Sequence, residues 1–557
     1  ASDVYKRQGL KWDAFLALSR ESNESQTYSS HYYPSIIGTE GSAEQSNYKN
    51  NNTQFETTLQ YIRSFGEHSL QALVGYTYEK GTENSASMSN VGFDFDDLGV
   101  NDMGSGTGLL NAKASMDSYK ESHTYIGFFG RILYNYDQRY LASVSLRRDG
   151  SSRFGKNNKW GWFPAVSLGW RISREAFMRD IEWLNELKIR GGYGVTGNQD
   201  FSNYKSLILM TTAGKFWYNG QWINTYQPAS NPNPDLQWEK KKEFNIGLDA
   251  QMFNSRLSFT FDYYHRTTDN LLYNYTVPTP PYIYNTLFTN VGKVTNRGVE
   301  FTISAIPVQT KDWNLTVGFN GTFQHTEFTK LNNTDDPDYA IQVSSITKGT
   351  GNLLQRHMVG YAPYTYYCFQ QVYDQDGKPI QNALVDRNKN GQIDQGDRYM
   401  TDKSPNPDFF YGISLKLSYK NWDFGFNGHG SAGNWVFNDF ASANSTSNID
   451  INAGNLPNFA RLVKKTGFTK ANSGEQWYSD MFLENASFFR MDDINLGYTF
   501  NKIGNWKGSM RVAFGVQNVF VITDYSGVDP EIPGVNGIDG SIWPRPRTYS
   551  LRLNVNF

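Results

Sequence analysis

The sequence alternates between apolar and polar residues with a period of two, in long stretches from one end of the chain to the other. In 244–252, for example, Phe244, Ile246 and Leu248 alternate with Asn245 and Gly247. A period of two is the repeat of a β-strand, whose successive side chains point to opposite faces. The chain is therefore predicted to be all-β, with strands that have one apolar face and one polar face.

The length of these stretches separates two all-β architectures. Strands of a β-sandwich average about 5–6 residues, whereas alternation here persists for about ten residues, the length that a tilted strand needs to cross a bilayer. Aromatic residues also gather near strand ends, as Tyr134, Tyr136 and Tyr140 do around one turn, and such girdles mark the two membrane interfaces of a barrel. We therefore expect a transmembrane antiparallel β-barrel.

Short turns and long polar excursions alternate along the chain. In bacterial barrels the short turns face the periplasm and the long loops face outward, so the excursions are expected to be extracellular. They span 21–52, 81–122, 197–237, 270–292, 329–407, 431–487 and 521–547.

This rule gives sixteen spanning strands, the first of which runs outward. Strand-like pieces inside the excursions, at 205–218 and 361–373, are expected to form hairpins that project above the membrane. The spanning strands lie near 10–20, 53–63, 68–80, 123–136, 139–149, 159–173, 187–196, 238–252, 256–269, 293–306, 312–328, 408–419, 422–430, 488–500, 508–520 and 548–557.

Composition excludes several other classes. Among 557 residues, 52 Lys and Arg face 54 Asp and Glu, so the chain has no long-range field for nucleic acid, which is not an expected partner. No stretch of about 18 residues is continuously apolar, which excludes a helical membrane bundle. The single cysteine, Cys368, excludes a disulfide framework. Residues 1–8 contain no signal peptide and are interpreted as a non-native or irregular leader before the barrel portion at 9–557.

Several motifs resemble the SusC/RagA-like TonB-dependent transporters of Bacteroidetes-type bacteria, and they follow that family's order along nearly the whole chain. They are 147–155 (RRDGSSRFG), 160–172 (WGWFPAVSLGWRI), 187–200 (LKIRGGYGVTGNQD), 233–249 (NPDLQWEKKKEFNIGLD), 290–301 (NVGKVTNRGVEF), 482–500 (FLENASFFRMDDINLGYTF) and the closing 543–557.

This resemblance implies a barrel of 22 strands around an N-terminal plug, of which this chain would supply the last sixteen strands without the plug. It also implies two protein partners: a SusD-like surface lipoprotein that captures the substrate, and TonB, which acts through the missing N-terminal region. Phe557, at the end of an alternating strand, looks like the signal that the barrel assembly machinery reads. The alternative is an ordinary last strand that ends in an apolar residue.

One loop follows the calcium-binding pattern. From Asp386 to Asp397, oxygen-bearing side chains stand at loop positions 1, 3, 5, 9 and 12, and a glycine stands at position 6. The candidate ligands are Asp386, Asn388, Asn390, Gln392 (through its carbonyl), Asp394 and Asp397. A polar turn whose Asn and Asp side chains cap backbone amides explains the same residues. No cofactor is required, and calcium would be structural.

No catalytic or cofactor-binding constellation is found, so the chain is not expected to be an enzyme. Residues 192–197 fit G-x-G-x-x-G, but no helix is predicted after them. Adjacent carboxylates such as Asp492 and Asp493 should point to opposite faces of a strand. Loop aromatics could stack on sugar, grip peptide, contact a partner or pack as hairpin cores; they are Phe216, Trp217, Tyr218, Trp222, Tyr361, Tyr364, Tyr366 and Tyr367.

The prediction is therefore the barrel part of an active importer of oligosaccharides or peptides across the bacterial outer membrane. Polar residues such as Arg171, Asp249, Asp262 and Gln324 are expected to face the lumen. A passive 16-stranded porin is the first alternative, since the strand count permits it. A secreted glycan-binding β-protein is the second.

Overall fold

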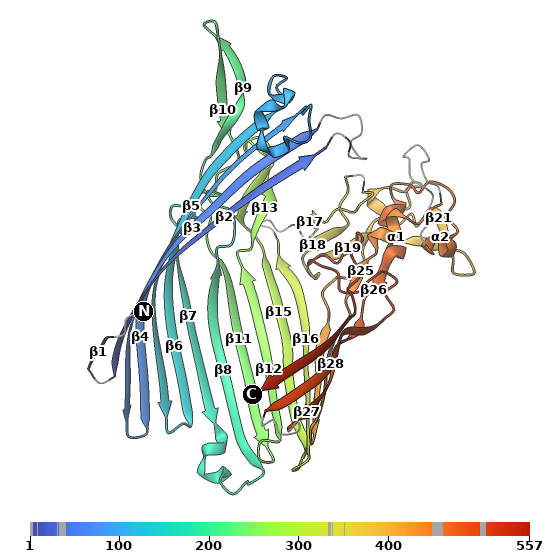
Figure 1. Cartoon of the computed structure of the whole chain (residues 1–557). Helices are drawn as coiled ribbons and strands as arrows, with labels where there is room; N and C mark the ends of the chain where they lie inside the picture. The colour runs from blue at the N-terminus through green and yellow to red at the C-terminus, as the bar shows by residue number, and fades with distance from the viewer. Residues whose placement is uncertain are drawn as a thin grey trace. The chain divides into compact units, whose positions relative to one another are not determined.

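The computed structural model describes residues 4–7, 9–30, 32, 41–331, 336, 338–349, 351–447, 461–501 and 508–556 (Figure 1). Backbone contacts divide the chain into two compact units. Unit 1 consists of Ala1–Leu168, Gly194–Lys241 and Asn270–Asn290, and unit 2 of Gly169–Tyr193, Lys242–Asp269 and Val291–Phe557.

Unit 1 contains long antiparallel strands that each pair with the next strand in sequence. The ladder between β3 and β4 is continuous from Ser42↔Val91 to Phe65↔His68. A four-residue strand, β1 (Val4–Arg7), pairs with the start of β2. The long strands are β2 (Leu10–Ser29), β3 (Ser42–Phe65), β4 (His68–Val91), β5 (Ser115–Tyr136) and β6 (Tyr140–Ser151).

Unit 2 repeats this neighbour-to-neighbour antiparallel pairing from β12 to β29. Its strands are β12 (Leu257–Asp269), β15 (Lys293–Gln309), β16 (Trp313–Lys330), β23 (Phe409–Tyr419), β24 (Trp422–Ala432), β27 (Phe488–Phe500), β28 (Ser509–Thr523) and β29 (Thr548–Asn556). Three more strands contribute residues to both units: β7 (Trp160–Arg171), β8 (Leu184–Asn198) and β11 (Glu239–Met252).

All sixteen predicted strands are present, and with β1 they make the 17 strands of the main sheet in the part of the chain that the structure describes. The excursion 21–52 is, however, largely strand, and both ends of the excursion 81–122 are strand, because β2 to β5 extend far into them. Residues 19–27 (SRESNESQT) show why the sequence missed this. Both faces of the strand are polar there, so the two-residue hydropathy period disappears although the ladder continues.

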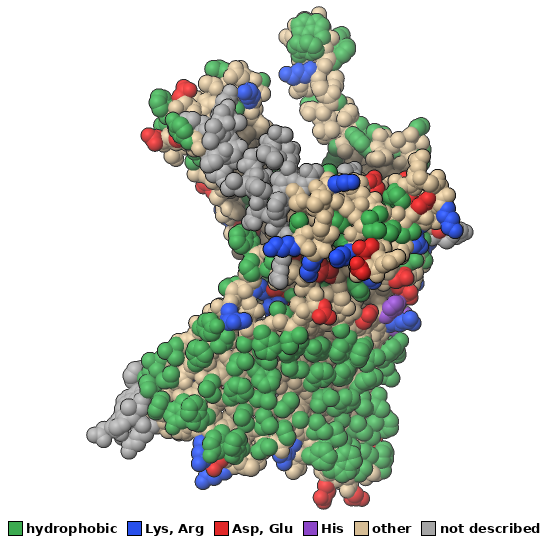
Figure 2. Space-filling model, turned by 90° about the vertical axis from the view of Figure 1, so that its right-hand side faces the viewer, with side chains coloured by type: hydrophobic (Ala, Val, Ile, Leu, Met, Phe, Trp, Pro, Cys, Tyr) green, Lys and Arg blue, Asp and Glu red, His purple; other side chains and the backbone are tan. Residues whose placement is uncertain are grey.

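The strands of unit 2 separate apolar from polar side chains. Phe261, Phe323, Leu496, Phe514 and Leu551 expose 38–76% of their surface, while the alternate positions carry ion pairs. We refer to these two sides as the apolar face and the polar face. Figure 2 shows one side of the molecule, on which hydrophobic side chains form a continuous band with charged groups beyond its edges.

Excursion residues of unit 2 form a core of their own. Tyr366, Cys368, Phe369 and Phe437 are completely buried in it. The elements formed by these excursions are β17 (Ala340–Val343), β18 (Gln355–Met358), β19 (Thr365–Cys368), β20 (Gln371–Tyr373), β21 (Pro379–Leu384), β22 (Tyr399–Met400), β25 (Trp435–Phe437), β26 (Leu483–Asn485), α1 (Asp439–Ala443) and α2 (Arg461–Thr466).

Unit 1 has a smaller core of Phe154, Phe163, Leu236 and Trp238. Gly155 lies so close to the neighbouring chain that an added Cβ would stand 1.9 Å from the carbonyl oxygen of Pro234. Two hairpins extend from this unit, formed by β9 (Met210–Tyr218) with β10 (Gln221–Pro228), and by β13 (Leu272–Thr276) with β14 (Thr286–Asn290).

The predicted hairpin at 205–218 is present in part, as β9 with β10, whereas residues 361–373 enter the small sheets of unit 2 through β19 and β20. Among the described helices, none combines the length and the apolar character that a membrane crossing requires.

Cys368 provides a test of the unit 2 excursion core. The thiol is fully buried, and burial raises the pKa of Cys368 to about 12. We expect maleimide at pH 8 to label the native protein at least about a hundredfold more slowly than the unfolded protein, because both the thiolate and access are missing. Labelling kinetics followed by mass spectrometry measure this ratio.

A Cys368→Ser/Gln227→Cys variant is the control, since Gln227 is exposed on β10. It should label rapidly in the native state. Equally rapid labelling of native Cys368 would show that this core is open.

Candidate functional site

The polar face of unit 2 carries a network of ion pairs across β8, β11 and β12. Arg190 binds both carboxylate oxygens of Asp249 at 3.1 Å and both oxygens of Asp262 at 2.6 Å. Lys188 adds a third contact to Asp249 at 3.4 Å. One guanidinium thus joins two strands, through a bidentate bond to Asp262 and through Nε, which is shared between the two oxygens of Asp249. The bidentate bond fixes its direction as well as its charge.

The other residues predicted for the lumen are also held by polar contacts. Arg171 binds both oxygens of Glu186 at 2.7 Å, and the Gln324 side chain donates to the Pro407 carbonyl at 3.1 Å. The four residues predicted for the lumen are therefore all held by other polar groups of the protein.

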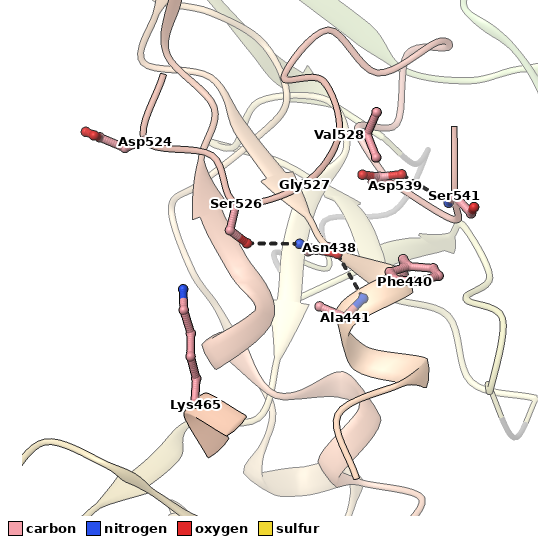
Figure 3. A pocket seen from close by; sticks show the side chains of 10 residues that line it. All are labelled: Asn438, Phe440, Ala441, Lys465, Asp524, Ser526, Gly527, Val528, Asp539 and Ser541. Carbon is pink, nitrogen blue, oxygen red and sulfur yellow. Dashed lines mark hydrogen bonds between the residues drawn. The ribbon is translucent and has the colours of Figure 1, made fainter. Parts of the chain in front are cut away.

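A cavity of about 590 Å³ lies among the excursions of unit 2 (Figure 3). One wall comes from the start of α1, a second from the chain after β28, and Lys465 of α2 approaches from a third side. Its lining residues are Asn438, Phe440, Ala441, Lys465, Asp524, Ser526, Gly527, Val528, Asp539 and Ser541.

Buried polar groups hold these walls in place. Asn438 caps α1, because its side-chain oxygen accepts from the Ala441 amide at 2.9 Å, and its amide nitrogen lies 3.4 Å from Ser526 Oγ. Asp539 accepts from the Tyr525 hydroxyl at 2.6 Å. Burial, reinforced by this hydrogen bond, raises the pKa of Tyr525 well above its usual value, so the phenol stays a neutral donor.

The cavity combines an exposed ring, Phe440, with carboxylate, ammonium and hydroxyl groups. Concave sites of this mixed kind hold polar organic ligands, since the apolar surface supplies contact area and a few polar groups set orientation. The arrangement can bind a ligand of this kind.

A buried ion-pair cluster fastens the chain after β28 to the sheet. Arg490 of β27, only 4% exposed, binds Asp529 at 2.6 Å, Glu531 at 2.7 Å and Asn518 at 2.7 Å. Arg545 contacts the same two carboxylates from the exposed side. We call this cluster the Arg490 clasp.

His429 of β24 joins the clasp through Glu531 at 3.0 Å and also binds Asp492 at 2.7 Å. The prediction that Asp492 and Asp493 point apart is wrong. Asp492 bonds to His429, whereas Asp493 bonds to Asn427 two residues away on β24. The pairing of β24 with β27 shifts register between Met491 and Asp493, because a β-bulge inserts an extra residue and turns both carboxylates to one side.

The calcium-like loop is held by hydrogen bonds within the loop. Asp386 accepts from the amides of Asn390 and Gly391, and Asp397, fully buried, accepts from those of Arg387, Asn388 and Asp394. The Asp394 amide, helped by the other two, holds the pKa of Asp397 below its usual value. The side-chain amide of Asn390 donates to Asp394 Oδ2 at 2.9 Å. The backbone amide of Gln392 donates to Asn390 Oδ1.

These contacts match the polar-turn alternative. In the described part of the chain, no three His, Cys, Asp or Glu side chains are arranged to hold a metal ion. Calcium at Asp386, Asn388, Asn390, Gln392, Asp394 and Asp397 stays a prediction, since the ligands would first have to turn away from backbone amides.

The remaining sequence hypotheses divide clearly. Residues 192–197 lie inside β8, so the dinucleotide motif has no helix. The hairpin aromatics Phe216, Trp217, Tyr218 and Trp222 are 53–65% exposed, so they are not a hairpin core, whereas Tyr366 and Tyr367 are buried. Phe557 lies outside the described residues.

Sequence reasoning missed Phe440, Asp524 and the Arg490 clasp, because no local pattern marks residues that meet only in the folded excursions.

Comparison with known proteins places the chain in a family. Residues 3–519 match the family model for the TonB dependent receptor-like beta-barrel. The chain belongs to the TonB-dependent receptor β-barrel family, whose members are outer-membrane proteins.

Two relatives illustrate the match. The TonB-dependent receptor SusC of Bacteroides thetaiotaomicron is 36% identical over 547 residues, which cover 95% of this chain and 52% of that protein. The TonB-dependent receptor P3 of Formosa agariphila is 27% identical over 587 residues, which cover 99% of this chain and 56% of that protein. The chain thus spans about half the length of the curated relatives it matches.

Solved structures agree with this family assignment. The RagAB peptide importer superimposes with a TM-score of 0.81 in its closed-closed state and 0.83 in its open-open state, at 25% identity in both. The whole of this chain is covered, together with 61% and 60% of those chains. The predicted barrel family is confirmed.

The Arg490 clasp makes a strong stability prediction. Arg490→Met leaves the buried Asp529 without its main partner, and we expect a loss of about 3–5 kcal/mol in the stability of the chain after β28. Limited proteolysis within 526–547 and thermal unfolding in detergent measure the effect.

Arg545→Gln is the matched control. It removes a cation from the same carboxylates, but Arg545 is 47% exposed, so the expected loss is below about 1 kcal/mol. Equal effects of the two substitutions would contradict the buried role of Arg490.

For the calcium loop, calorimetric titration with CaCl₂ separates the two interpretations: a calcium site would give a dissociation constant of about 10⁻⁴–10⁻³ M. Asp394→Asn should abolish this heat, because it removes a ligand charge, whereas Asp376→Asn in the adjacent turn should leave it unchanged. No heat from the unaltered protein at millimolar calcium would establish the polar-turn interpretation.

Proposed function

We propose that this chain forms the lumen wall and outer loops of an active importer that carries oligosaccharides or peptides across the bacterial outer membrane. The observation that carries the proposal is the division of the strands into an apolar face and an ion-paired polar face. The backbone that holds these faces is similar to RagAB along the whole of the present chain. The apolar face contacts lipid, and the polar face lines a wet transport path.

The proposal includes orientation and partners. The excursions face outward, a SusD-like lipoprotein closes over them, and TonB supplies energy from the inner membrane. The similarity to SusC and to RagAB supports this arrangement. The sixteen strands belong to a barrel of 22 strands around a plug, and the chain acts without catalysing a reaction.

The cavity beside α1 is the proposed point of substrate contact. Phe440 offers a ring face to a sugar or peptide side chain, and Asp524, Lys465 and Ser526 offer groups for hydroxyl or amide partners. The clasp keeps one wall of the cavity attached to β27, so that the cavity keeps its shape when the excursions bind substrate.

An uptake experiment tests the proposal. Cells that lack the gene are complemented with the full-length protein and given labelled neutral oligosaccharides and peptides as a panel. We expect uptake of at least one member to require the gene and to stop when a protonophore collapses the inner-membrane gradient. Phe440→Ala should raise the concentration for half-maximal uptake about tenfold, because a central aromatic contact is lost.

Asp376→Asn is the control for the excursions, since Asp376 lies outside the cavity. Uptake that continues under the protonophore would indicate a passive pore. Uptake unaffected by Phe440→Ala would remove the cavity from the proposal while leaving the importer intact.

A further inference from the structure

Three nitrogen-bearing side chains form a row across adjacent strands of unit 2. His265 of β12 stands directly opposite Arg297 of β15, and Arg297 stands directly opposite His325 of β16. All three residues are exposed. Because partners in register share a face of the sheet, they form one line, which we call the basic row.

The basic row lies on the apolar face, at the point where that face ends. Two residues from it along each strand, on the side of the apolar face, stand Tyr263, Val299 and Phe323, which are also opposite one another. Phe323 stacks on Phe409 of β23 at 4.2 Å. Three strands therefore change from aromatic or aliphatic to basic at the same register position.

Its position matches the edge of a membrane. His265 lies eight residues after Leu257, which corresponds to about 26 Å along a strand. A strand tilt of about 40° reduces this to about 20 Å across the bilayer, close to the roughly 25 Å apolar band of such barrels.

Arg297 differs from the arginines of the polar face. Arg171, Arg190 and Arg511 each bind a carboxylate through two nitrogens or two oxygens. Within the described residues, Arg297 makes no ion pair and no side-chain hydrogen bond. An exposed guanidinium beside hydrocarbon, with no anion of its own, is a ready site for an anion.

We propose that the basic row binds the phosphate of an outer-leaflet lipid headgroup, with Arg297 as its bidentate partner. The His265 imidazole donates to the phosphate from the neighbouring strand. His325 lies on the other side of Arg297, so the row spans about 10 Å, the width of three strands. The acyl chains lie on Tyr263, Phe323 and the apolar positions before them. A free phosphate ion would use the row but not this apolar surface, and for that reason the structure favours a lipid.

The neighbouring polar groups favour one end of the basic row. Thr267 and Thr295 stand opposite each other one step further out on the same face and can bind headgroup oxygens. Glu327 stands in that outer line too, 3.7 Å from His325. Its negative charge repels a phosphate at that end and directs it toward Arg297 and His265.

Unit 1 shows a similar end to its apolar face. On β6, the exposed Val144 and Leu146 are followed at the next alternate position by Arg148. Its guanidinium lies 5.0 Å from the Trp160 ring and 5.1 Å from the Trp162 ring. Aromatic rings around a cation are typical of the interface between lipid tails and headgroups.

The inference rests on the orientation in the proposed function, but it is tested separately. The full-length protein, purified in detergent, is titrated with diphosphoryl lipid A and with the same lipid after enzymatic removal of its phosphates. Retained lipid is counted by native mass spectrometry. We expect the phosphorylated lipid to bind preferentially, and Arg297→Gln to weaken it about fivefold.

A triple variant, His265→Gln/Arg297→Gln/His325→Gln, should lose the preference altogether. Lys311→Gln is the matched control, because it removes an exposed cation at the opposite end of the same strands. Heat-dependent gel migration confirms that each variant is folded.

Three results would overturn the inference. They are equal binding of the dephosphorylated lipid, unchanged lipid binding by the Arg297→Gln variant, and competition by inorganic phosphate as strong as that by the lipid. The uptake assay distinguishes failure of the proposed function. Lost uptake in the unaltered protein with a retained lipid preference would overturn the importer and leave the lipid site standing.

Discussion

The structure depends on one constraint: a backbone in hydrocarbon must satisfy every N–H and C=O group within the protein. Continuous antiparallel ladders meet this requirement, and they leave each strand with two faces that meet different surroundings. The apolar face of unit 2 exposes rings and aliphatic chains, while the polar face joins Arg190, Asp249 and Asp262 by ion pairs. Alternation in the sequence is the direct record of this division.

The same constraint explains what the sequence could predict. Wherever hydrocarbon covers one face, period-two hydropathy is strong, and all sixteen strands are recovered there. Where β2 to β5 carry polar residues on both faces, the period-two signal disappears, and the sequence predicts loops instead of strands. The pairing continues because backbone hydrogen bonds do not depend on side-chain polarity.

The candidate site was harder to predict, for a different reason. Asn438, Phe440, Asp524 and Asp539 come from segments up to about a hundred residues apart, and each alone reads as an ordinary loop residue. The calcium pattern was visible because its residues are consecutive. A β-bulge at Asp492 likewise carries no local signal, so the simple rule of alternate faces failed there.

The continuous ladder between β3 and β4 has a mechanical consequence. Its 24 residues per strand, from Ser42↔Val91 to Phe65↔His68, are paired without a bulge or hinge, and they extend for about 80 Å. Bending such a ribbon strains many hydrogen bonds at once, so it behaves as a stiff lever rather than as a flexible tether. A force applied at its far tip is therefore delivered to the wall of the barrel with little loss.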